Sequence, residues 1–382
     1  MLAAGKPRRE KVLALWSEMG LESWSEGWSE IGLNSAWLGG VVLLAAAGLD
    51  FVLGDPWCLP HPVQAMGKVI DLYSQMMFRL PLKGWTMRAG GVGLACVLIG
   101  GSGLLSGYGL WALGLISIRL QVVIAGVLLA SCFAGRSLRR AAEDVMQYLP
   151  SENWVGTSDE IDETDDLVKA RSQLAMYVGR DTHQLSAAEI RRAVLETVSE
   201  NGIDGVLAPL FYALLGLWLG AWFAPKTEGL IGVVLPVSMA IAYKAASTLD
   251  SMVGYREPPY TDLGWFSAKL EDVLTWFPCR CSVMTIALLS GRPWQVLQLC
   301  WRDANADPSP NAGWSECAYA AALGVQLGGP NTYRGKVTKK PFLGDANRPI
   351  TSAVINQALS LTRRSFLIGL VVGMTGLMAI IE

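Results

Sequence analysis

Three carboxylates recur at every fourth position in one segment: Glu196, Glu200 and Asp204. If the segment is helical, this spacing places them on one face. Carboxylates on one face repel each other unless a cation or protons lie between them, and Mg²⁺ prefers oxygen ligands that it commonly shares with phosphate. The spacing therefore predicts a magnesium site. The alternative is an acidic solvent-exposed face paired with Lys and Arg.

A second acidic group follows Arg302 in the chain. Asp303 and Asp307 could bind a further cation or orient an amine. The short polar residues with Pro and Gly favour a loop whose backbone N–H groups face an anion. The candidate binding residues in this segment and the glycine-rich stretch after it are Arg302, Asn305, Asn311, Trp314 and Asn331. The alternative is a set of Asx-turns and an N-cap for a helix after Asn311.

Two lysines are candidates for holding phosphate. Lys244 lies near the end of an apolar stretch, six positions before Asp250, which is itself a candidate binding residue. An ionisable group at such a depth is costly and indicates function. Lys269 lies in the next polar segment. Because an ammonium acts on phosphate as a point charge, either lysine fits. For Lys244, the alternative is a side chain that merely extends to the membrane interface.

Asp55 and His61 lie in a loop rich in Gly and Pro that follows the first apolar stretch. Prolines make such an exit loop rigid, so both residues are expected at the membrane surface, where a site is dry and still reachable from water. They are therefore candidate binding residues. The alternative is that Asp55 caps a turn and His61 packs against protein.

The composition indicates that a membrane protein positions these residues. Of 382 residues, 52% are hydrophobic and only 17% are charged, with a mean hydropathy of +0.34, whereas soluble domains have about 25% charged residues. Six apolar stretches are candidate transmembrane helices: 36–53, 89–111, 120–134, 206–223, 229–246 and 366–381. The apolar run 282–289 is too short to span and is expected to be a buried or re-entrant helix. Residues 1–35 are expected to form an amphipathic or disordered tail.

The predicted fold is an all-α, polytopic membrane bundle over residues 36–382, with cytoplasmic helical loops that form the active site. Lys and Arg concentrate in three long polar segments, 54–88, 135–205 and 249–364, which therefore face the cytoplasm. The balance of 31 Lys and Arg against 33 Asp and Glu argues against nucleic acid as a partner. Seven Cys without a CxxC pair, and only two His, argue against a disulfide scaffold and a His-rich metal site.

Seven segments, in this order, resemble the adenosylcobinamide-phosphate synthase family, the CbiB/CobD proteins of cobalamin biosynthesis. They include ARSQLAMYVGRDT at 170–182, YKAASTLDSMVGY at 243–255, RDANADPSPNAGWSE at 302–316 and GGPNTYRG at 328–335, together with 49–63, 196–216 and 260–280. The resemblance covers roughly residues 37–380 and leaves the N-terminal tail outside it.

The resemblance implies a multi-pass enzyme of the cell membrane that uses ATP and Mg²⁺ to join adenosylcobyric acid to (R)-1-amino-2-propanol O-2-phosphate, or to aminopropanol, as an amide. It implies Mg²⁺ ligands among the carboxylates above, phosphate contacts from Lys244 or Lys269, and transfer of the amine proton to Asp262 or Asp272. Further positive charge for the anionic substrates would come from Arg171, Arg180 and Arg302. The expected partners are both substrates, the lipid bilayer and other membrane-associated enzymes of the pathway; no oligomeric state is predicted.

The alternative function is a non-catalytic membrane sensor or a transporter on the same scaffold. Transporters commonly carry inverted repeats and ionisable residues deep inside their spans. In this sequence the apolar stretches are nearly free of charge, no internal symmetry is visible, and the polar groups collect on one side of the membrane. The pattern therefore favours the enzyme.

Overall fold

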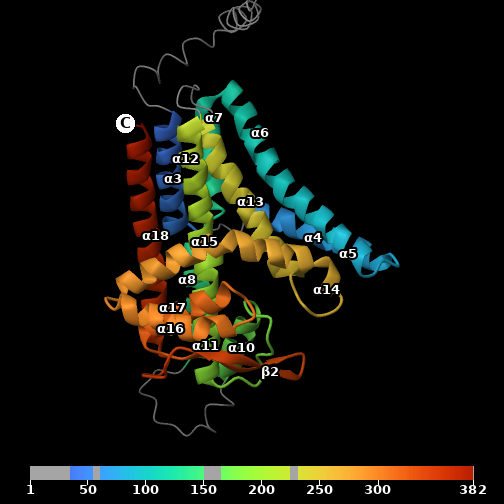
Figure 1. Cartoon of the computed structure of the whole chain (residues 1–382), viewed down its shortest axis with the longest axis vertical. Helices are drawn as coiled ribbons and strands as arrows, with labels where there is room; N and C mark the ends of the chain where they lie inside the picture. Colours follow the sequence, from blue (N-terminus) through green and yellow to red (C-terminus); the bar gives the residue numbers. More distant parts are fainter. Residues whose placement is uncertain (1–34, 55–60, 150–164, 224–230, 382) are drawn as a thin grey trace, which may run out of the picture.

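The computed structural model describes residues 35–54, 61–149, 165–223 and 231–381. Its helices form a bundle with a second layer at one end (Figure 1). The bundle consists of α3 (Ser35–Val52), α6 (Gly101–Ile116), α7 (Ile118–Ala130), α12 (Ala208–Phe223), α13 (Ile231–Val253) and α18 (Ser352–Ile381). The layer, here called the polar layer, contains α11 (Ala187–Gly202), α15 (Trp265–Leu289), α16 (Pro293–Asp303), α17 (Ala312–Leu323) and a β-hairpin.

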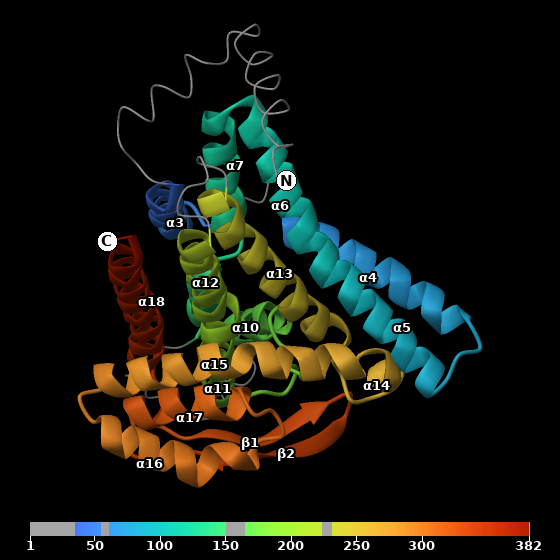
Figure 2. The ribbon, with the colours of Figure 1, turned by 45° about the horizontal axis from the view of Figure 1, so that its top comes forward.

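The remaining helices flank these two parts. On one side of the bundle, α4 (Pro62–Arg79) packs against α13 and against α5 (Trp85–Ala95), which continues through the π-helical turn η1 (Cys96–Gly100) into α6 (Figure 2). In the polar layer, α8 (Gly135–Met146) and α10 (Asp165–Ala175) pack against α11. Two short elements, α14 (Tyr260–Leu263) and the 3₁₀ turn η3 (Ala304–Ala306), precede α15 and follow α16.

The prediction of an all-α polytopic bundle is confirmed. Among the described residues, six helices are long and apolar enough to cross a membrane: Trp85–Ile116, Ile118–Met146, Ala187–Phe223, Ile231–Val253, Trp265–Leu289 and Ser352–Ile381. A helix occupies each of the six predicted stretches, although α3, over 36–53, is shorter than these six. The run 282–289 belongs to the 25-residue helix α15. Residues 1–34 lie outside the described residues, so the tail stays a prediction.

One continuous helix, Ala187–Phe223, connects the polar layer to the bundle. It begins with a capping box in which the side chains of Ser186 and Glu189 bind each other's backbone N–H groups, which satisfies N–H groups that lack a partner in the helix. The turn η2 (Ile203–Leu207) is π-helical. The half of the long helix that lies in the bundle, α12, packs closely on α13. A Cβ at Gly216 would lie 2.5 Å from the carbonyl oxygen of Leu235, so this approach requires glycine.

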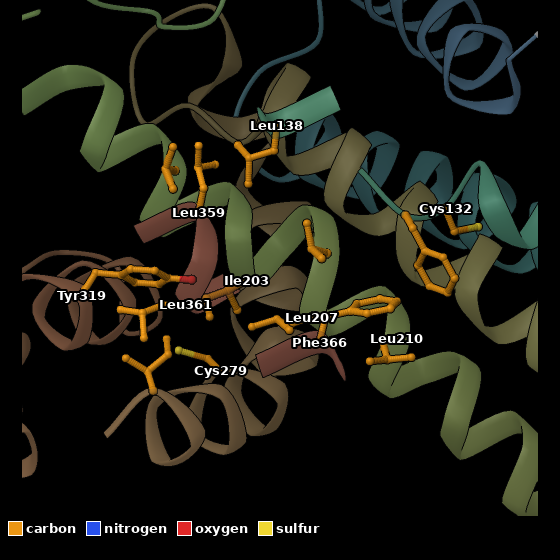
Figure 3. Close-up of a cluster of buried hydrophobic side chains, with 14 of the residues drawn as sticks. Cys132, Leu138, Ile203, Leu207, Leu210, Cys279, Tyr319, Leu359, Leu361 and Phe366 are labelled. Atoms are coloured by element: carbon orange, nitrogen blue, oxygen red, sulfur yellow. The ribbon is translucent and has the colours of Figure 1, made fainter. Parts of the chain in front are cut away.

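A hydrophobic core extends from the bundle into the polar layer. Figure 3 shows Ile203 of η2 and Leu361 of α18 beside Tyr319 of α17 and Cys279 of α15. The Tyr319 hydroxyl is 2.6 Å from the hydroxyl of Thr362 on α18. Because apolar packing and a buried hydrogen bond both connect α17 to bundle helices, the polar layer has a fixed position relative to the bundle.

The hairpin is a feature that the sequence analysis did not predict. Strands β1 (Leu327–Tyr333) and β2 (Lys336–Leu343) pair antiparallel, with Tyr333 opposite Lys336. Gly328 and Gly329 have φ values of 82° and 93°, and the pairing is irregular at this point. Positive φ values favour glycine, so the Gly-Gly-Pro sequence that resembles a loop is a bulged strand.

Candidate active site

Glu196 on α11 belongs to a closed network of charged groups. Its carboxylate accepts a short hydrogen bond from Arg180 and a 3.0 Å bond from the backbone N–H of Gly328, and it lies 3.9 Å from Nε of Arg192. Arg180 also donates to Asn331 at 2.8 Å. Arg192 donates to the carbonyl of Gly328 and to Asn331. The Arg180 and Glu196 side chains are less than 10% exposed, so this network attaches β1 to α11.

The carboxylates Glu196, Glu200 and Asp204 lie on one helix as predicted, but they do not form one ligand set. Eight residues of α-helix span about 12 Å, which is too far for one ion, and the π-helical turn η2 begins at Ile203, one residue before Asp204. Both oxygens of Glu196 already have partners. The three-residue site is therefore replaced by two neighbourhoods, one around Glu196 and one around Glu200.

The second neighbourhood, here called the acidic cluster, gathers carboxylates from four helices and one loop. Glu200 interacts electrostatically with Asp307, and Asp204 with Glu200, Asp250 and Glu271. Asp250 and Glu271 in turn interact with Asp272 and with Glu200. The cluster comprises Glu200, Asp204, Asp250, Glu271, Asp272, Asp307 and Glu316. Predicted metal, binding and catalytic residues from distant segments are thereby brought together.

Lys340 and Lys244 bring positive charge to the acidic cluster. Lys340, on β2, places Nζ 3.4 Å from Oε1 of Glu316. Burial lowers the pKa of Lys340, but four carboxylates (Glu316, Glu200, Asp307 and Glu196) outweigh burial and hold this pKa above its ordinary value. Lys244 on α13 interacts with Asp204. Lys269 adds a third ammonium, 3.8 Å from Asp272, but these lysines are still fewer than the seven carboxylates, so some of the carboxylates must share protons or a cation.

Two carboxylate oxygens of the acidic cluster are buried and accept no hydrogen bond from the described residues: Oδ2 of Asp307 and Oε2 of Glu316. Glu316 is fully buried, and burial, assisted by neighbouring carboxylates, raises its pKa to about 8. A buried carboxylate oxygen without a partner is unfavourable. Glu200, by contrast, is exposed. A cation that brought ligand oxygens with it would satisfy these groups.

The donor set fits Mg²⁺ chemically, because every candidate ligand is a carboxylate oxygen. Within the described ranges, no three His, Cys, Asp or Glu side chains are close enough together to hold a metal by themselves. Mg²⁺ usually binds one or two carboxylates and completes its octahedron with waters and substrate phosphates. The arrangement therefore suits a metal that arrives with a phosphorylated substrate, and Mg²⁺ stays a prediction.

Glu271 is held in the acidic cluster by a buried chain of hydroxyls. It accepts a short hydrogen bond from Thr275, whose hydroxyl is 2.8 Å from that of Tyr243 on α13. The ring of Tyr212 stacks on Tyr243 with a centroid distance of 4.8 Å. These contacts restrict the rotamers of Glu271, so α15 presents a positioned carboxylate to the cluster.

Asp303 and Asp307, predicted as one pair, have different surroundings. Asp303 accepts two hydrogen bonds of 2.7 Å from Arg302 and one of 2.9 Å from the backbone N–H of Gly344. The hydrogen bond from Arg302 holds the pKa of Asp303 below its ordinary value. Arg302 also binds Asp345 at 2.8 Å. Only Asp307 belongs to the acidic cluster, so Arg302 and Asp303 connect the end of α16 to the segment that follows β2.

Asp262 and Lys269, predicted to be catalytic, lie outside the acidic cluster. The two oxygens of Asp262 bind Arg88 at 3.0 Å and the backbone N–H of Gly84 at 3.1 Å, which ties α14 to the start of α5. Lys269 is largely exposed and lies 3.8 Å from Asp272. Asp272 remains in the cluster, so it is the better placed of the two predicted proton acceptors.

Two further predicted binding residues have local structural roles. His61 caps α4 by accepting a hydrogen bond from the backbone N–H of Val63 at 3.3 Å. Arg171 donates to the carbonyl of Leu185 at 2.9 Å and so holds the loop before α11. Asp55 lies outside the described residues, and its assignment stays a prediction.

Asn311 and Trp314 surround Arg280, a residue that the sequence analysis did not select. Asn311 accepts from Arg280 at 2.9 Å and donates to the backbone carbonyl of Asp272 at 2.9 Å. The Arg280 guanidinium lies 4.8 Å from the Trp314 ring and 5.0 Å from the Trp276 ring. Trp314 also donates to Asn305 at 3.2 Å. This set supports the edge of the acidic cluster near Asp272.

Sequence reasoning missed four residues that the structure makes central: Arg192, Glu271, Glu316 and Lys340. Glu271 had a signal, because it directly precedes Asp272 in a mostly apolar helix. Glu316 closes the motif that contains Asp307, but nothing in the motif distinguishes a buried carboxylate from an exposed one. Lys340 and Arg192 gave no signal, because their roles depend on pairing between β1, β2 and α11.

A family model described as CobD/Cbib protein matches residues 43–362. The chain is 47% identical over 340 residues to the cobalamin biosynthesis protein CobD of Synechocystis sp., an alignment that covers 89% of this chain and 92% of that one. It is 38% identical over 318 residues to CbiB of Salmonella arizonae, with coverages of 82% and 89%. For CobD of Halalkalibacterium halodurans the identity is 37% over 332 residues, with coverages of 86% and 93%. No solved structure matches the chain. The chain belongs to the CobD/CbiB family of cobalamin biosynthesis proteins.

Proposed function

We propose that this chain is an ATP-dependent acid–amine ligase, an adenosylcobinamide-phosphate synthase. It joins the carboxyl group of adenosylcobyric acid to (R)-1-amino-2-propanol O-2-phosphate, or to aminopropanol, as an amide. The observation that carries the proposal is the acidic cluster, in which one buried oxygen each of Asp307 and Glu316 accepts no hydrogen bond from the residues that the structure describes, close to Lys340. Family membership and the motifs of the sequence support the choice of substrates.

The reaction needs activation, because a carboxylate is a poor acyl donor. Attack of the substrate carboxylate oxygen on the γ-phosphorus of ATP forms an acyl phosphate and releases ADP. The amine then attacks the acyl carbon, the C–O bond to phosphate breaks, and inorganic phosphate leaves. The amine loses one proton to a base in this step. The site must therefore hold several phosphates and a carboxylate, and also accept a proton.

The residues of the acidic cluster suit these tasks. Glu200 and Asp307 would hold Mg²⁺ brought by the nucleotide, and the metal would offset phosphate charge as the acyl phosphate forms. Lys340 and Lys244 would contact phosphate oxygens as point charges. Asp272 would accept the amine proton, because the other predicted acceptor, Asp262, is already bound to Arg88. Negative charge also favours approach of an ammonium substrate.

The proposed location of the acidic cluster is the cytoplasmic face of the cell membrane. The polar layer lies at one end of the bundle (Figure 1) and contains most of two Lys- and Arg-rich segments, 135–205 and 249–364. Arg88, the last residue of the remaining Lys- and Arg-rich segment, 54–88, binds Asp262, which lies just before α15. An excess of Lys and Arg on one side marks the cytoplasmic side, where ATP is available.

Purified protein in detergent tests the proposal. With adenosylcobyric acid, ATP, Mg²⁺ and aminopropanol phosphate, ADP release should require both organic substrates and should match the amide formed. Glu200→Gln should abolish this activity, whereas Glu143→Gln, at an exposed ion pair with Arg139, should not. ATP hydrolysis that ignores the amine, or no turnover alongside tight corrinoid binding, would contradict the ligase and favour a sensor or transporter.

A further inference from the structure

Helix α15 has the length and composition of a membrane span, but it does not run with the spanning helices. Figures 1 and 2 both show it lying crosswise to α12, α13 and α18, at the end of the bundle where the polar layer begins. Spanning helices share one direction across the bilayer. The orientation of α15 is therefore that of a helix parallel to the membrane plane.

The side chains of α15 are not distributed as in a soluble amphipathic helix, because its exposed face is the more apolar one. Its buried face is mixed: Ser267, Glu271, Thr275 and Ser282 lie there together with apolar residues such as Val283 and Ile286. Its exposed face is an apolar stripe at helical spacing, here called the α15 stripe: Val273, Trp276, Phe277, Cys281, Met284 and Leu288. A helix in water exposes its polar face. This distribution indicates that the exposed face of α15 meets something apolar.

The α15 stripe continues the outer surface of the bundle. The Phe277 ring lies 5.4 Å from the ring of Phe211 on α12, and the neighbouring Tyr212 donates to the backbone carbonyl of Leu274 at 3.0 Å. Both contacts lie near the start of α12. The stripe therefore begins where the surface of a spanning helix ends.

We propose that α15 lies in the plane of the membrane interface, with the α15 stripe against lipid acyl chains and the opposite face forming a wall of the acidic cluster. The occupant of the stripe is lipid, because the stripe is continuous with the lipid-facing bundle. Trp276 supplies an amphipathic ring of the kind enriched at this depth. Lys269, an exposed cation one turn before Val273, can reach anionic headgroups.

Label depth in vesicles tests this arrangement. In a Cys58→Ser, Cys96→Ser, Cys281→Ser background the remaining cysteines are buried, so a single added cysteine at Val273, Met284 or Leu288 can carry a nitroxide. Collision rates with oxygen and with a water-soluble nickel chelate then give its depth in phosphatidylcholine–phosphatidylglycerol vesicles. The three labels should lie at one depth, within about 5 Å, the rise of one helical turn, and should favour oxygen over the chelate.

Helix α18 supplies the matched control, because Leu367, Val371 and Met378 are also exposed apolar residues but lie on a spanning helix. Their depths should change steadily over about 16 Å.

Cys281 itself, labelled in the Cys58→Ser, Cys96→Ser background, tests the stripe without any substitution in α15. A depth gradient of about 22 Å from Val273 to Leu288 would show that α15 crosses the bilayer. Strong collision with the nickel chelate at all α15 positions would show that the stripe does not meet lipid. Either result overturns the proposal, whatever the activity of the protein.

Discussion

Glu196 and Glu200 lie one turn apart on α11, yet their surroundings are opposite. Glu196 is buried, and its carboxylate binds Arg180 and the backbone of Gly328. Glu200 is exposed and faces Asp307, with Lys340 as its main cationic neighbour. The first carboxylate is satisfied by the fold, whereas the second belongs to a cluster in which buried carboxylate oxygens accept no hydrogen bond from the described residues.

This difference shows how to separate structural from functional carboxylates in a chain with few charges. Charged side chains that are buried in a fold are normally paired and hydrogen-bonded, as Glu196 is. A cluster with excess negative charge and unpartnered oxygens, such as those of Asp307 and Glu316, is costly in the free protein. Such a cost persists at sites where a bound cation or substrate removes it.

The largest expected effect is on catalysis, from Glu200→Gln. This substitution removes a carboxylate that would hold the metal and phosphates, so we expect product formation to fall about 100-fold or more with stability unchanged or raised. Paired measurements of amide formation and of urea unfolding in detergent check this. Retention of full activity would show that Glu200 is not part of the site. The comparison of a structural Glu196 with a functional Glu200 would then be wrong.

The next effect is on stability, from Glu196→Ala. Removing one partner of a buried ion pair leaves Arg180 and Arg192 without their carboxylate, which costs roughly 3–5 kcal/mol of unfolding free energy. Urea unfolding measures the loss, and Glu143→Ala, at an exposed pair, is the control. A loss no greater than that of the control would mean that the network around Glu196 does not stabilise the fold.

A smaller effect should appear as a pH dependence of stability in ligand-free protein. Burial raises the pKa of Glu316 to about 8 from the ordinary 4.5, so between these values the folded protein holds a proton that the unfolded chain releases. The contribution of Glu316 to the free energy of unfolding should therefore fall as pH rises from about 4.5 to about 8. Unfolding in urea at several pH values should give a flatter profile for Glu316→Gln. An identical slope in both proteins would contradict a raised pKa for the buried Glu316 carboxyl.

The smallest effect is expected from Asp303→Asn. Its partner Arg302 is half exposed, and such ion pairs contribute about 1 kcal/mol or less. Both stability and amide formation should stay near those of the unaltered protein. A loss of activity comparable to that of Glu200→Gln would instead return Asp303 to the set of metal ligands.

Hydropathy predicted the bundle well, because about 20 apolar residues are needed to cross a bilayer wherever they occur. The stretches 206–223 and 229–246 correspond closely to α12 and α13. Hydropathy could not predict that α15 lies crosswise, since length and composition do not encode direction. The hairpin was missed because its Gly-Gly-Pro bulge has the composition of a loop.

The site was only partly predictable for a related reason. The four-residue spacing identified a helix that carries carboxylates, but only the tertiary pairing with Arg180 and β1 separates Glu196 from Glu200. Asp262 was predicted as a proton acceptor, but Arg88, which is distant in sequence, binds its carboxylate. Partners contributed by remote segments decide which polar residues remain available to a substrate.

The continuous helix from Ala187 to Phe223 connects the membrane-embedded bundle directly to the acidic cluster. One half of this rod is embedded among apolar helices and the other half carries Glu200. Spanning helices tilt when the hydrocarbon layer becomes thinner or thicker. Because the network around Glu196 attaches β1 to α11, such a tilt would move Glu200 and the hairpin together relative to the membrane surface. If the proposed function holds, the rate of amide formation in vesicles should therefore depend on acyl-chain length.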